Sequence, residues 1–368
     1  MKDEDTVTLR QYASTVFVAL FSPMSRLLPG AAAELAGASG WVGPLLALLP
    51  LAGLTALMYW LLRFGDRSLG LGETLCRSLG DFPGKGLSLL LALWLVFYGG
   101  FLLRSGSERL ISTVYPSAGP GFFLPWLLGV CILAAMGKLR YAFRCGTVIL
   151  ILFSATLVLI YLLALPSVKL SCLWPPRLLE PGKLALSALP AMDTLSPWVY
   201  FTFLRGYVRE DANALKRGLK GITVTSLGGL LLLVATLGVL GPELTKRQQY
   251  PFFIMIKNLS VFHVIQRIEP LVVTVWLMTD FICVTLVLLS AAEALAGVFP
   301  GKRTRYVPAC GLGMLILGFL MAPDALSLAR LSDIVVPGIN LGIAFLLLPL
   351  TGLAKLSTKK SRNVQNNS

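Results

Sequence analysis

The chain has 368 residues, of which 56% are hydrophobic and only 14% are charged, and its mean hydropathy is +0.77. Soluble domains contain about 25% charged residues, so this composition excludes a water-soluble fold and predicts an all-α polytopic membrane protein. The net charge of +14 lies between apolar runs rather than in a basic, aromatic-rich domain, so no nucleic-acid partner is expected.

The apolar runs predict about ten transmembrane helices, because each span needs about 20 apolar residues. The runs lie near 13–37, 41–62, 86–110, 122–137, 144–165, 185–207, 219–240, 266–297, 306–322 and 331–354. We therefore expect a single transmembrane domain over 1–354, surrounded by membrane lipid. A polar and basic cytoplasmic tail is expected over 355–368.

The orientation of the predicted spans follows from the positions of Lys and Arg. Most of these residues lie in the two terminal segments and in the connections that follow the second, fourth, sixth and eighth spans. Positively charged connections stay on the cytoplasmic side of a membrane. Both termini are therefore expected in the cytoplasm.

The first and sixth spans contain residues that interrupt helices. Span 1 contains Pro23 and Pro29, and span 6 contains Pro190 and Pro197. Proline removes a helical hydrogen bond, and broken helices at matching positions of two halves indicate a transporter-type binding site. Simple proline kinks, which membrane helices tolerate, are the alternative.

The candidate ligand-binding residues are polar or aromatic and lie at these interruptions or on the facing surfaces of spans 3 and 8. A charged side chain inside the membrane costs several kcal/mol unless it is paired, which makes it a functional candidate. Aromatic residues at helical spacing on span 3, and the spacing of Trp276 and Asp280 on span 8, predict the pocket walls. The predicted set is Ser22, Ser25, Arg26, Trp94, Tyr98, Asp193, Thr194, Ser196, Trp276 and Asp280.

Arg26 and Asp193 carry opposite charges in the two interruptions. They can pair with each other, or they can bind the carboxylate and the amine of a zwitterionic ligand with help from nearby helix ends. Enzyme chemistry has little support, because the chain has one histidine, no Cys-x-x-Cys pair, no phosphate-binding loop and no nucleophile elbow. No catalytic residue, metal or cofactor is expected.

The stretch from Tyr250 to Trp276 resembles the B-subunit family of bacterial spore germinant receptors. The residues that carry the resemblance are Tyr250-Pro251, the basic Lys257, Arg267-Ile268-Glu269 and Trp276, together with a hinge-like Ala36-Gly37 and Gly40-Trp41. The family belongs to the amino acid–polyamine–organocation superfamily. The resemblance implies a LeuT-like fold of two inverted five-helix repeats, about 13–165 and 185–354, with broken helices 1 and 6.

The same resemblance implies a function and a cellular setting. It implies a subunit that binds a small germinant, such as an amino acid, and triggers germination from the inner membrane of the endospore. Its implied partners are an A subunit and a lipoprotein C subunit. Arg26 and Asp193 depart from the family pattern, so a germinant other than a simple neutral amino acid is an open possibility. An autonomous H⁺- or Na⁺-coupled amino acid permease is the alternative function.

The outer connection 246–269 is predicted to be a docking or signalling segment outside the ligand pocket. Its apolar residues can form one face of a short helix in the membrane interface. A purely structural lid is the alternative. The residues assigned to this segment are Tyr250, Pro251, Lys257, Arg267 and Glu269.

Overall fold

The computed structural model describes residues 5–64, 67–115, 119–174, 181–259, 269–322 and 324–356. Its longer helices are α1 (Leu9–Ala36), α2 (Gly43–Leu62), α4 (Asp81–Thr113), α5 (Pro120–Met136), α6 (Leu139–Ala164), α9 (Ala214–Leu240), α12 (Glu269–Val298) and α13 (Arg303–Leu320). The shorter α-helices are α3 (Leu71–Leu79), α7 (Pro181–Leu186), α8 (Ala188–Leu195), α10 (Pro242–Arg247), α11 (Pro251–Lys257), α14 (Ala325–Arg330) and α15 (Val336–Gly342).

The remaining elements are tight or wide helical turns and one small hairpin. The 3₁₀ segments are η2 (Gly37–Val42), η3 (Leu165–Ser167), η4 (Leu170–Cys172) and η5 (Ser196–Tyr207), and the π-helical segments are η6 (Leu331–Val335) and η7 (Ile343–Leu347). The antiparallel strands β1 (Arg63–Phe64) and β2 (Arg67–Ser68) follow α2.

The molecule is a multi-pass integral membrane protein. Within the described residues, six helical stretches are long and apolar enough to cross a membrane: Leu9–Leu62, Asp81–Thr113, Leu139–Ser167, Ala214–Leu240, Pro270–Val298 and Leu326–Leu356. Gly121–Met136 is a shorter apolar helix. The first stretch contains two predicted spans joined by η2, and helices lie at each of the predicted positions. The number of ten crossings stays a prediction.

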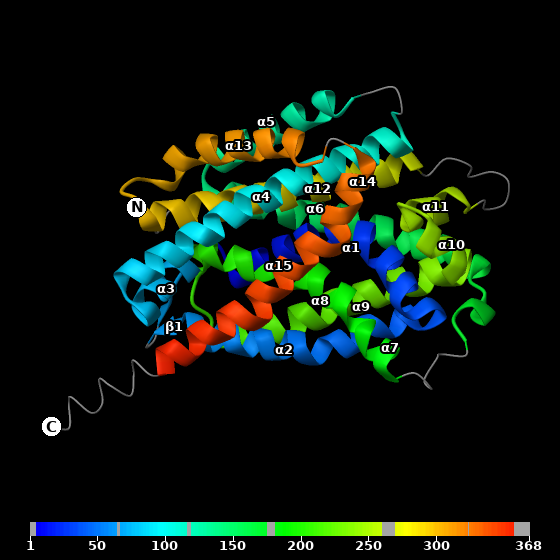
Figure 1. Cartoon of the computed structure of the whole chain (residues 1–368), viewed down its shortest axis with the longest axis horizontal. Coiled ribbons are helices and arrows are strands. Elements are labelled where there is room, and N and C mark those ends of the chain that lie inside the picture. Colours follow the sequence, from blue (N-terminus) through cyan, green and yellow to red (C-terminus); the bar gives the residue numbers. More distant parts are fainter. Residues whose placement is uncertain are drawn as a thin grey trace.

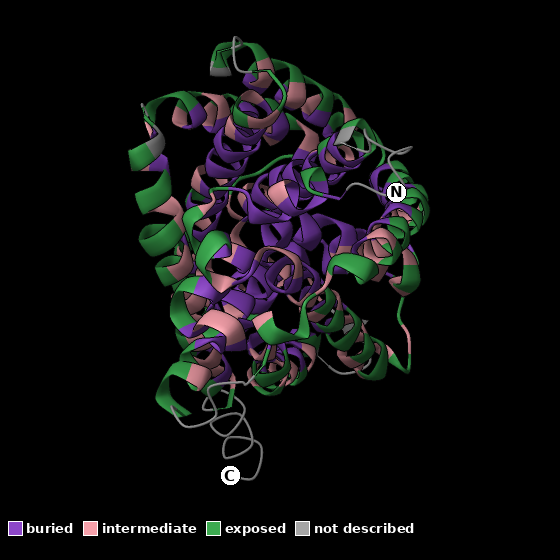
Figure 2. Ribbon diagram, turned by 90° about the vertical axis from the view of Figure 1, so that its right-hand side faces the viewer, coloured by how far each residue is buried: buried purple, intermediate pink, exposed green. Residues whose placement is uncertain are grey.

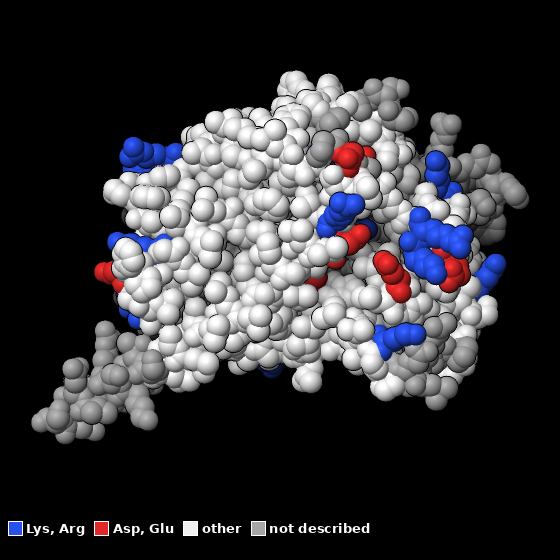
Figure 3. All heavy atoms as spheres, viewed as in Figure 1, with Lys and Arg blue, Asp and Glu red and all other residues white. Residues whose placement is uncertain are grey.

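The outer surface has the composition that lipid requires. Large apolar side chains such as Leu49 and Leu133 are 82% and 76% exposed, and exposed residues line the outside of the bundle while buried residues fill its centre (Figure 2). Figure 3 shows a broad uncharged surface over the left and middle of this face, with Lys, Arg, Asp and Glu at the left end and over the right half. Apolar side chains fully exposed to water would be unfavourable, whereas contact with hydrocarbon costs nothing.

The connections are sorted between the two ends of the bundle. Figure 1 shows α3 and β1 at one end and α7, α10 and α11 at the other. At the α3 end, the backbone of Val7 pairs with that of Val208 just after η5, and Lys355 Nζ donates to the carbonyls of Trp60, Leu61 and Arg63. Both ends of the described chain therefore lie on one side, whose assignment to the cytoplasm stays a prediction.

Helix α1 corrects one sequence-based expectation. It is a continuous α-helix that contains Pro23 and Pro29, so the predicted break in span 1 is wrong. Each proline removes a single hydrogen bond from the ladder, and Ser25 Oγ donates to the Ser22 carbonyl at 3.1 Å within the same turns. Packing against the surrounding helices stabilises the rest of α1, as it does in other membrane helices that contain proline.

The chain turns sharply only after α1 ends. Gly37 has φ of +55°, which a residue with a Cβ rarely adopts. A Cβ on Gly40 would lie 2.7 Å from the carbonyl oxygen of Ala32, so close packing also requires glycine there. These two glycines form the expected hinge between the first two spans.

Span 6 does change its helical form. The α-helix α8 ends at Leu195, and η5 continues as a 3₁₀ helix of 12 residues with Pro197 near its start. Such helices rarely exceed four residues, and a longer one often marks a hinge or a functional site. The change places the peptide groups around Asp193 at a helix junction deep in the molecule.

Candidate functional site

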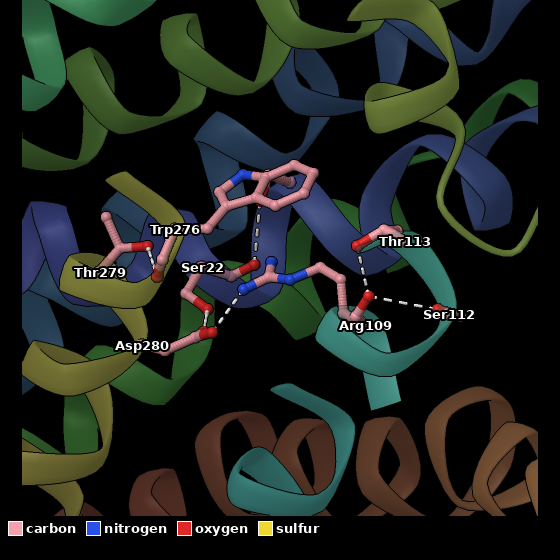
Figure 4. Close-up of polar contacts among 8 residues, drawn as sticks. Ser22, Arg109, Ser112, Thr113, Trp276, Thr279 and Asp280 are labelled. Atoms are coloured by element: carbon pink, nitrogen blue, oxygen red, sulfur yellow. Dashed lines mark hydrogen bonds and ion pairs between the residues drawn. The ribbon is translucent and has the colours of Figure 1, made fainter. Parts of the chain in front are cut away.

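The first polar cluster, the Asp280 cluster, consists of Ser22, Arg109, Trp276 and Asp280. Asp280 of α12 accepts hydrogen bonds from Ser22 Oγ of α1 and from Arg109 Nη2 of α4 (Figure 4). The guanidinium carbon of Arg109 lies 4.4 Å from the centre of the Trp276 ring. Gly106 makes room for this arrangement, since a Cβ there would lie 3.2 Å from Asp280 Oδ2.

All four members of the Asp280 cluster are buried. Removing two charges from water costs several kcal/mol per ion, and the opposite charges of Arg109 and Asp280 offset part of that cost. Asp280 accepts hydrogen bonds from Arg109 and Ser22, whereas Nε and Nη1 of Arg109 have no hydrogen-bond partner among the described residues. The indole face adds about 2 kcal/mol of cation–π attraction when the cation is desolvated. The cluster therefore ties α1, α4 and α12 together in the interior of the bundle.

The second polar cluster, the Asp193 cluster, consists of Trp94, Asp193, Tyr200 and Asn340. Asn340 Nδ2 donates to Asp193 Oδ1 at 3.1 Å, and Asn340 Oδ1 accepts from Tyr200 Oη at 2.8 Å. Tyr200 Oη in turn accepts from Trp94 Nε1 at 3.0 Å. The ring of Tyr98 lies 6.1 Å from those of both Trp94 and Tyr200. The chain of bonds thus joins α4, α8, η5 and α15.

Arg26 lies near Tyr98 and near Arg109 of the Asp280 cluster, but it belongs to neither cluster. Its side chain is only 4% exposed, and none of its three guanidinium nitrogens has a hydrogen-bond partner among the described residues. The positive charge of Arg26 interacts electrostatically with the side chains of Tyr98 and Arg109. Burial raises the pKa of Tyr250, and the positive charges of Arg26 and Arg109 act in the opposite direction. The direct pairing of Arg26 with Asp193, which was one alternative, is not found.

The hydroxyl groups at the predicted interruptions are engaged with backbone carbonyls. Ser25 Oγ donates to Ser22, Thr194 Oγ1 donates to Pro190 at 2.8 Å, and Ser196 Oγ donates to the Asp193 carbonyl at 3.4 Å. These bonds satisfy backbone groups around the prolines and the helix junction. The three hydroxyls therefore shape the helices around the site.

Helix α11 differs from the predicted interfacial helix. Pro251, Phe252, Phe253, Met255 and Ile256 are buried, so the helix is not lying on the surface with one apolar face. The rings of Phe252 and Phe253 lie 6.4 and 5.4 Å from that of Trp276. With five of its seven residues enclosed, burial against the bundle removes more apolar surface from water than an interfacial position would.

The other members of the predicted docking segment are placed only in part. Lys257 is exposed at the end of α11, and Tyr250 is buried just before it. Arg267 lies outside the described residues, and the structure describes the backbone of Glu269 but not its side chain. Their assignment to a docking or signalling role stays a prediction.

Sequence reasoning missed Arg109, Tyr200 and Asn340. Arg109 lies within a predicted span, four residues after Ser105 on the same helix face, so the rule that singled out Arg26 and Asp280 also applies to it. Asn340 is likewise a polar residue inside a predicted span. The bond from Tyr200 to Asn340 joins residues 140 apart and has no signal in the sequence.

This fold, with its buried polar clusters between helices, is that of a transporter-type membrane protein. A solved structure of a Na⁺-coupled sialic acid symporter, in a substrate-bound outward-open state, superposes with a TM-score of 0.61. The superposition covers 93% of this chain and 80% of the symporter at 13% sequence identity, so the likeness concerns the fold alone.

The family model described as spore germination protein matches residues 6–326. The chain belongs to this family of permease-like membrane proteins, and the resemblance of the Tyr250–Trp276 stretch is thereby confirmed. No curated protein sequence matches the chain.

Proposed function

We propose that this chain is the transporter-fold subunit of a spore germinant receptor, which binds a small polar germinant and triggers germination. It acts in the inner membrane of the endospore with an A subunit and a lipoprotein C subunit. The germinant binds between α1, α4 and the α8–η5 junction, and it carries a carboxylate, as an amino acid does. Family membership supports the receptor role. The location of the site is supported by Arg26, which is buried and has no hydrogen-bond partner among the described residues.

The buried guanidinium of Arg26, which has no hydrogen-bond partner among the residues that the structure describes, is the single observation that carries this proposal. A buried charge without a partner is costly, because the interior supplies none of the hydrogen bonds that water gave it. A carboxylate can accept two parallel hydrogen bonds from one guanidinium, which is among the strongest pairings in proteins. A bound carboxylate would therefore supply the hydrogen bonds that the buried guanidinium lacks among the described residues, and so offset its desolvation cost.

The Asp193 cluster gives the opposite end of such a ligand a place to bind. Asn340 occupies Oδ1 of Asp193, and the carboxylate has a second oxygen that can accept from a ligand amine. Trp94 and Tyr98 supply flat apolar surface next to it. The cluster thus suits the amine of a zwitterion, with Arg26 as its carboxylate partner.

The test uses spores in which Arg26→Gln replaces the wild-type residue. Germination is followed against the concentration of each L-amino acid in a panel, and against the matching amino acid amides, which lack the carboxylate. We expect wild-type spores to respond to an acid and not to its amide. A charged hydrogen bond is worth about 1.5–3 kcal/mol, so Arg26→Gln should raise the effective concentration by roughly tenfold or more.

Arg77→Gln is the matched control, because the Arg77 side chain is half-exposed on α3 and pairs with Glu73 of the same helix, so it lies outside the buried clusters. Both variants are compared at equal protein levels in the spore membrane. An unchanged concentration dependence in Arg26→Gln spores would place the germinant elsewhere.

A further inference from the structure

We propose that Arg109 is a built-in counter-ion for Asp280, so that the central site operates without a bound Na⁺. The inference concerns the ionic requirement of the protein, and it holds whichever germinant binds. It also separates a ligand-driven receptor from a Na⁺-coupled permease. It is carried by the contacts, the burial and the charges of the Asp280 cluster.

The oxygen atoms of this cluster are suitable ligands for a small cation. Asp280 contributes a carboxylate from α12 and Ser22 contributes a hydroxyl from α1, and the two groups are in direct contact. Small, hard cations bind to carboxylate and hydroxyl oxygens of this kind. Both side chains are fully enclosed, so the negative charge of Asp280 requires a positive partner at this place.

The positive partner is already part of the chain. Arg109 Nη2 donates to Asp280 Oδ2, and the guanidinium is held over the ring of Trp276. Figure 4 shows the guanidinium pointing from α4 toward Asp280 and Ser22, with Trp276 on the other side. Gly106, one turn earlier on α4, allows the two helices to approach closely enough for this contact.

A tethered guanidinium differs from a bound ion in one decisive respect. An ion drives a conformational cycle only by binding one state better than another and leaving between them. Arg109 cannot dissociate from the chain, and an arginine side chain does not lose its proton in proteins. The Asp280 cluster therefore carries no exchangeable charge, and the difference in affinity for the ligand alone shifts the conformational equilibrium.

The experiment measures thermal unfolding of the purified full chain with a thiol-reactive fluorophore, which reports on the buried Cys131, Cys283 and Cys310. The probe ion is Na⁺ itself, as NaCl against choline chloride at equal concentration. Wild-type protein should unfold at the same temperature in both salts. Arg109→Gln should unfold several degrees lower in choline chloride and recover part of the loss in NaCl, since the freed oxygens can then bind Na⁺.

Two further variants make the result specific. The double variant Arg109→Gln/Asp280→Asn should lose the recovery in NaCl, because no carboxylate remains. Arg104→Gln is the matched control, because Arg104 is buried on the same helix but pairs with Glu108 and the Ala322 carbonyl. Its substitution should lower the unfolding temperature by the same amount in both salts.

Stabilisation of the wild-type protein by NaCl over choline chloride would overturn the proposal, and that measurement needs no variant to fold. Equal unfolding of Arg109→Gln in both salts would overturn it as well, because the cluster would then have no affinity for a cation.

Discussion

Asp280 and Asp193 are both carboxylates enclosed by membrane-spanning helices, yet the protein surrounds them differently. Asp280 is bound by a guanidinium and a hydroxyl from two other helices. Asp193 receives one hydrogen bond from the neutral amide of Asn340. The first carboxylate is committed to holding the helices together, and the second retains capacity for a ligand. An intramembrane charge therefore identifies a function only together with its partner.

The largest expected effect comes from removing the charge of Asp280. Asp280→Asn leaves Arg109 buried without a counter-charge, which should cost about 3–5 kcal/mol of unfolding free energy. Asp193→Asn keeps an oxygen that can accept the hydrogen bond from Asn340, so this variant should lose no more than about 1 kcal/mol of unfolding free energy. Denaturant unfolding of both purified variants measures the difference. Similar losses would show that the two carboxylates have equivalent structural roles.

A smaller effect is expected from cutting the Asp193 cluster at its centre. Asn340→Leu removes the donor to Asp193 and the acceptor for Tyr200, which should cost about 2 kcal/mol at roughly 1 kcal/mol per hydrogen bond. The same substitution should weaken the response to germinant, because Asp193 and Tyr200 lose their fixed positions. Thr351→Val is the control, because Thr351 lies in the same helical stretch, Leu326–Leu356, and its hydroxyl donates to the backbone carbonyl of Leu348. A normal germinant response with reduced stability would separate this cluster from the binding site.

The smallest effect on stability is expected at the exposed end of α11. Lys257→Gln changes a solvated side chain and should leave the unfolding temperature of the purified chain unchanged, since surface substitutions usually stay within about 0.5 kcal/mol. If Lys257 docks a partner subunit, copurification of the A or C subunit should fall while ligand response in assembled complexes stays normal. Unchanged copurification would leave α11 as a cover over Trp276 and remove the docking role.

The helices were predictable because hydropathy is a local property. Each apolar run reports the transfer free energy of its own residues, so the positions of α4, α6, α9 and α12 follow from the sequence without knowledge of their neighbours. The continuity of α1 did not follow in the same way. Proline marks where a helix loses a backbone hydrogen bond, but the packing of the surrounding helices determines whether the helix then breaks.

The buried position of α11 was also beyond a reading of the sequence. Its short apolar pattern fits an interfacial helix and an inserted one equally well, because both need an apolar surface. Contact of Phe252 and Phe253 with Trp276 selects the second arrangement. The deciding partner, Trp276, lies in α12 beyond the end of the segment 246–269.

By itself, the sequence determined the membrane class, the positions of the helices and the presence of Arg26, Asp193 and Asp280 within them. The tertiary structure decided which of these charges are paired. Arg109 and Asp280 are 171 residues apart, and their contact depends on the rotation and crossing of α4 and α12. Those quantities arise from packing between helices, whose free energy no single helix encodes. The same packing leaves Arg26 without a hydrogen-bond partner among the described residues, and this is why it is the residue proposed to meet the ligand.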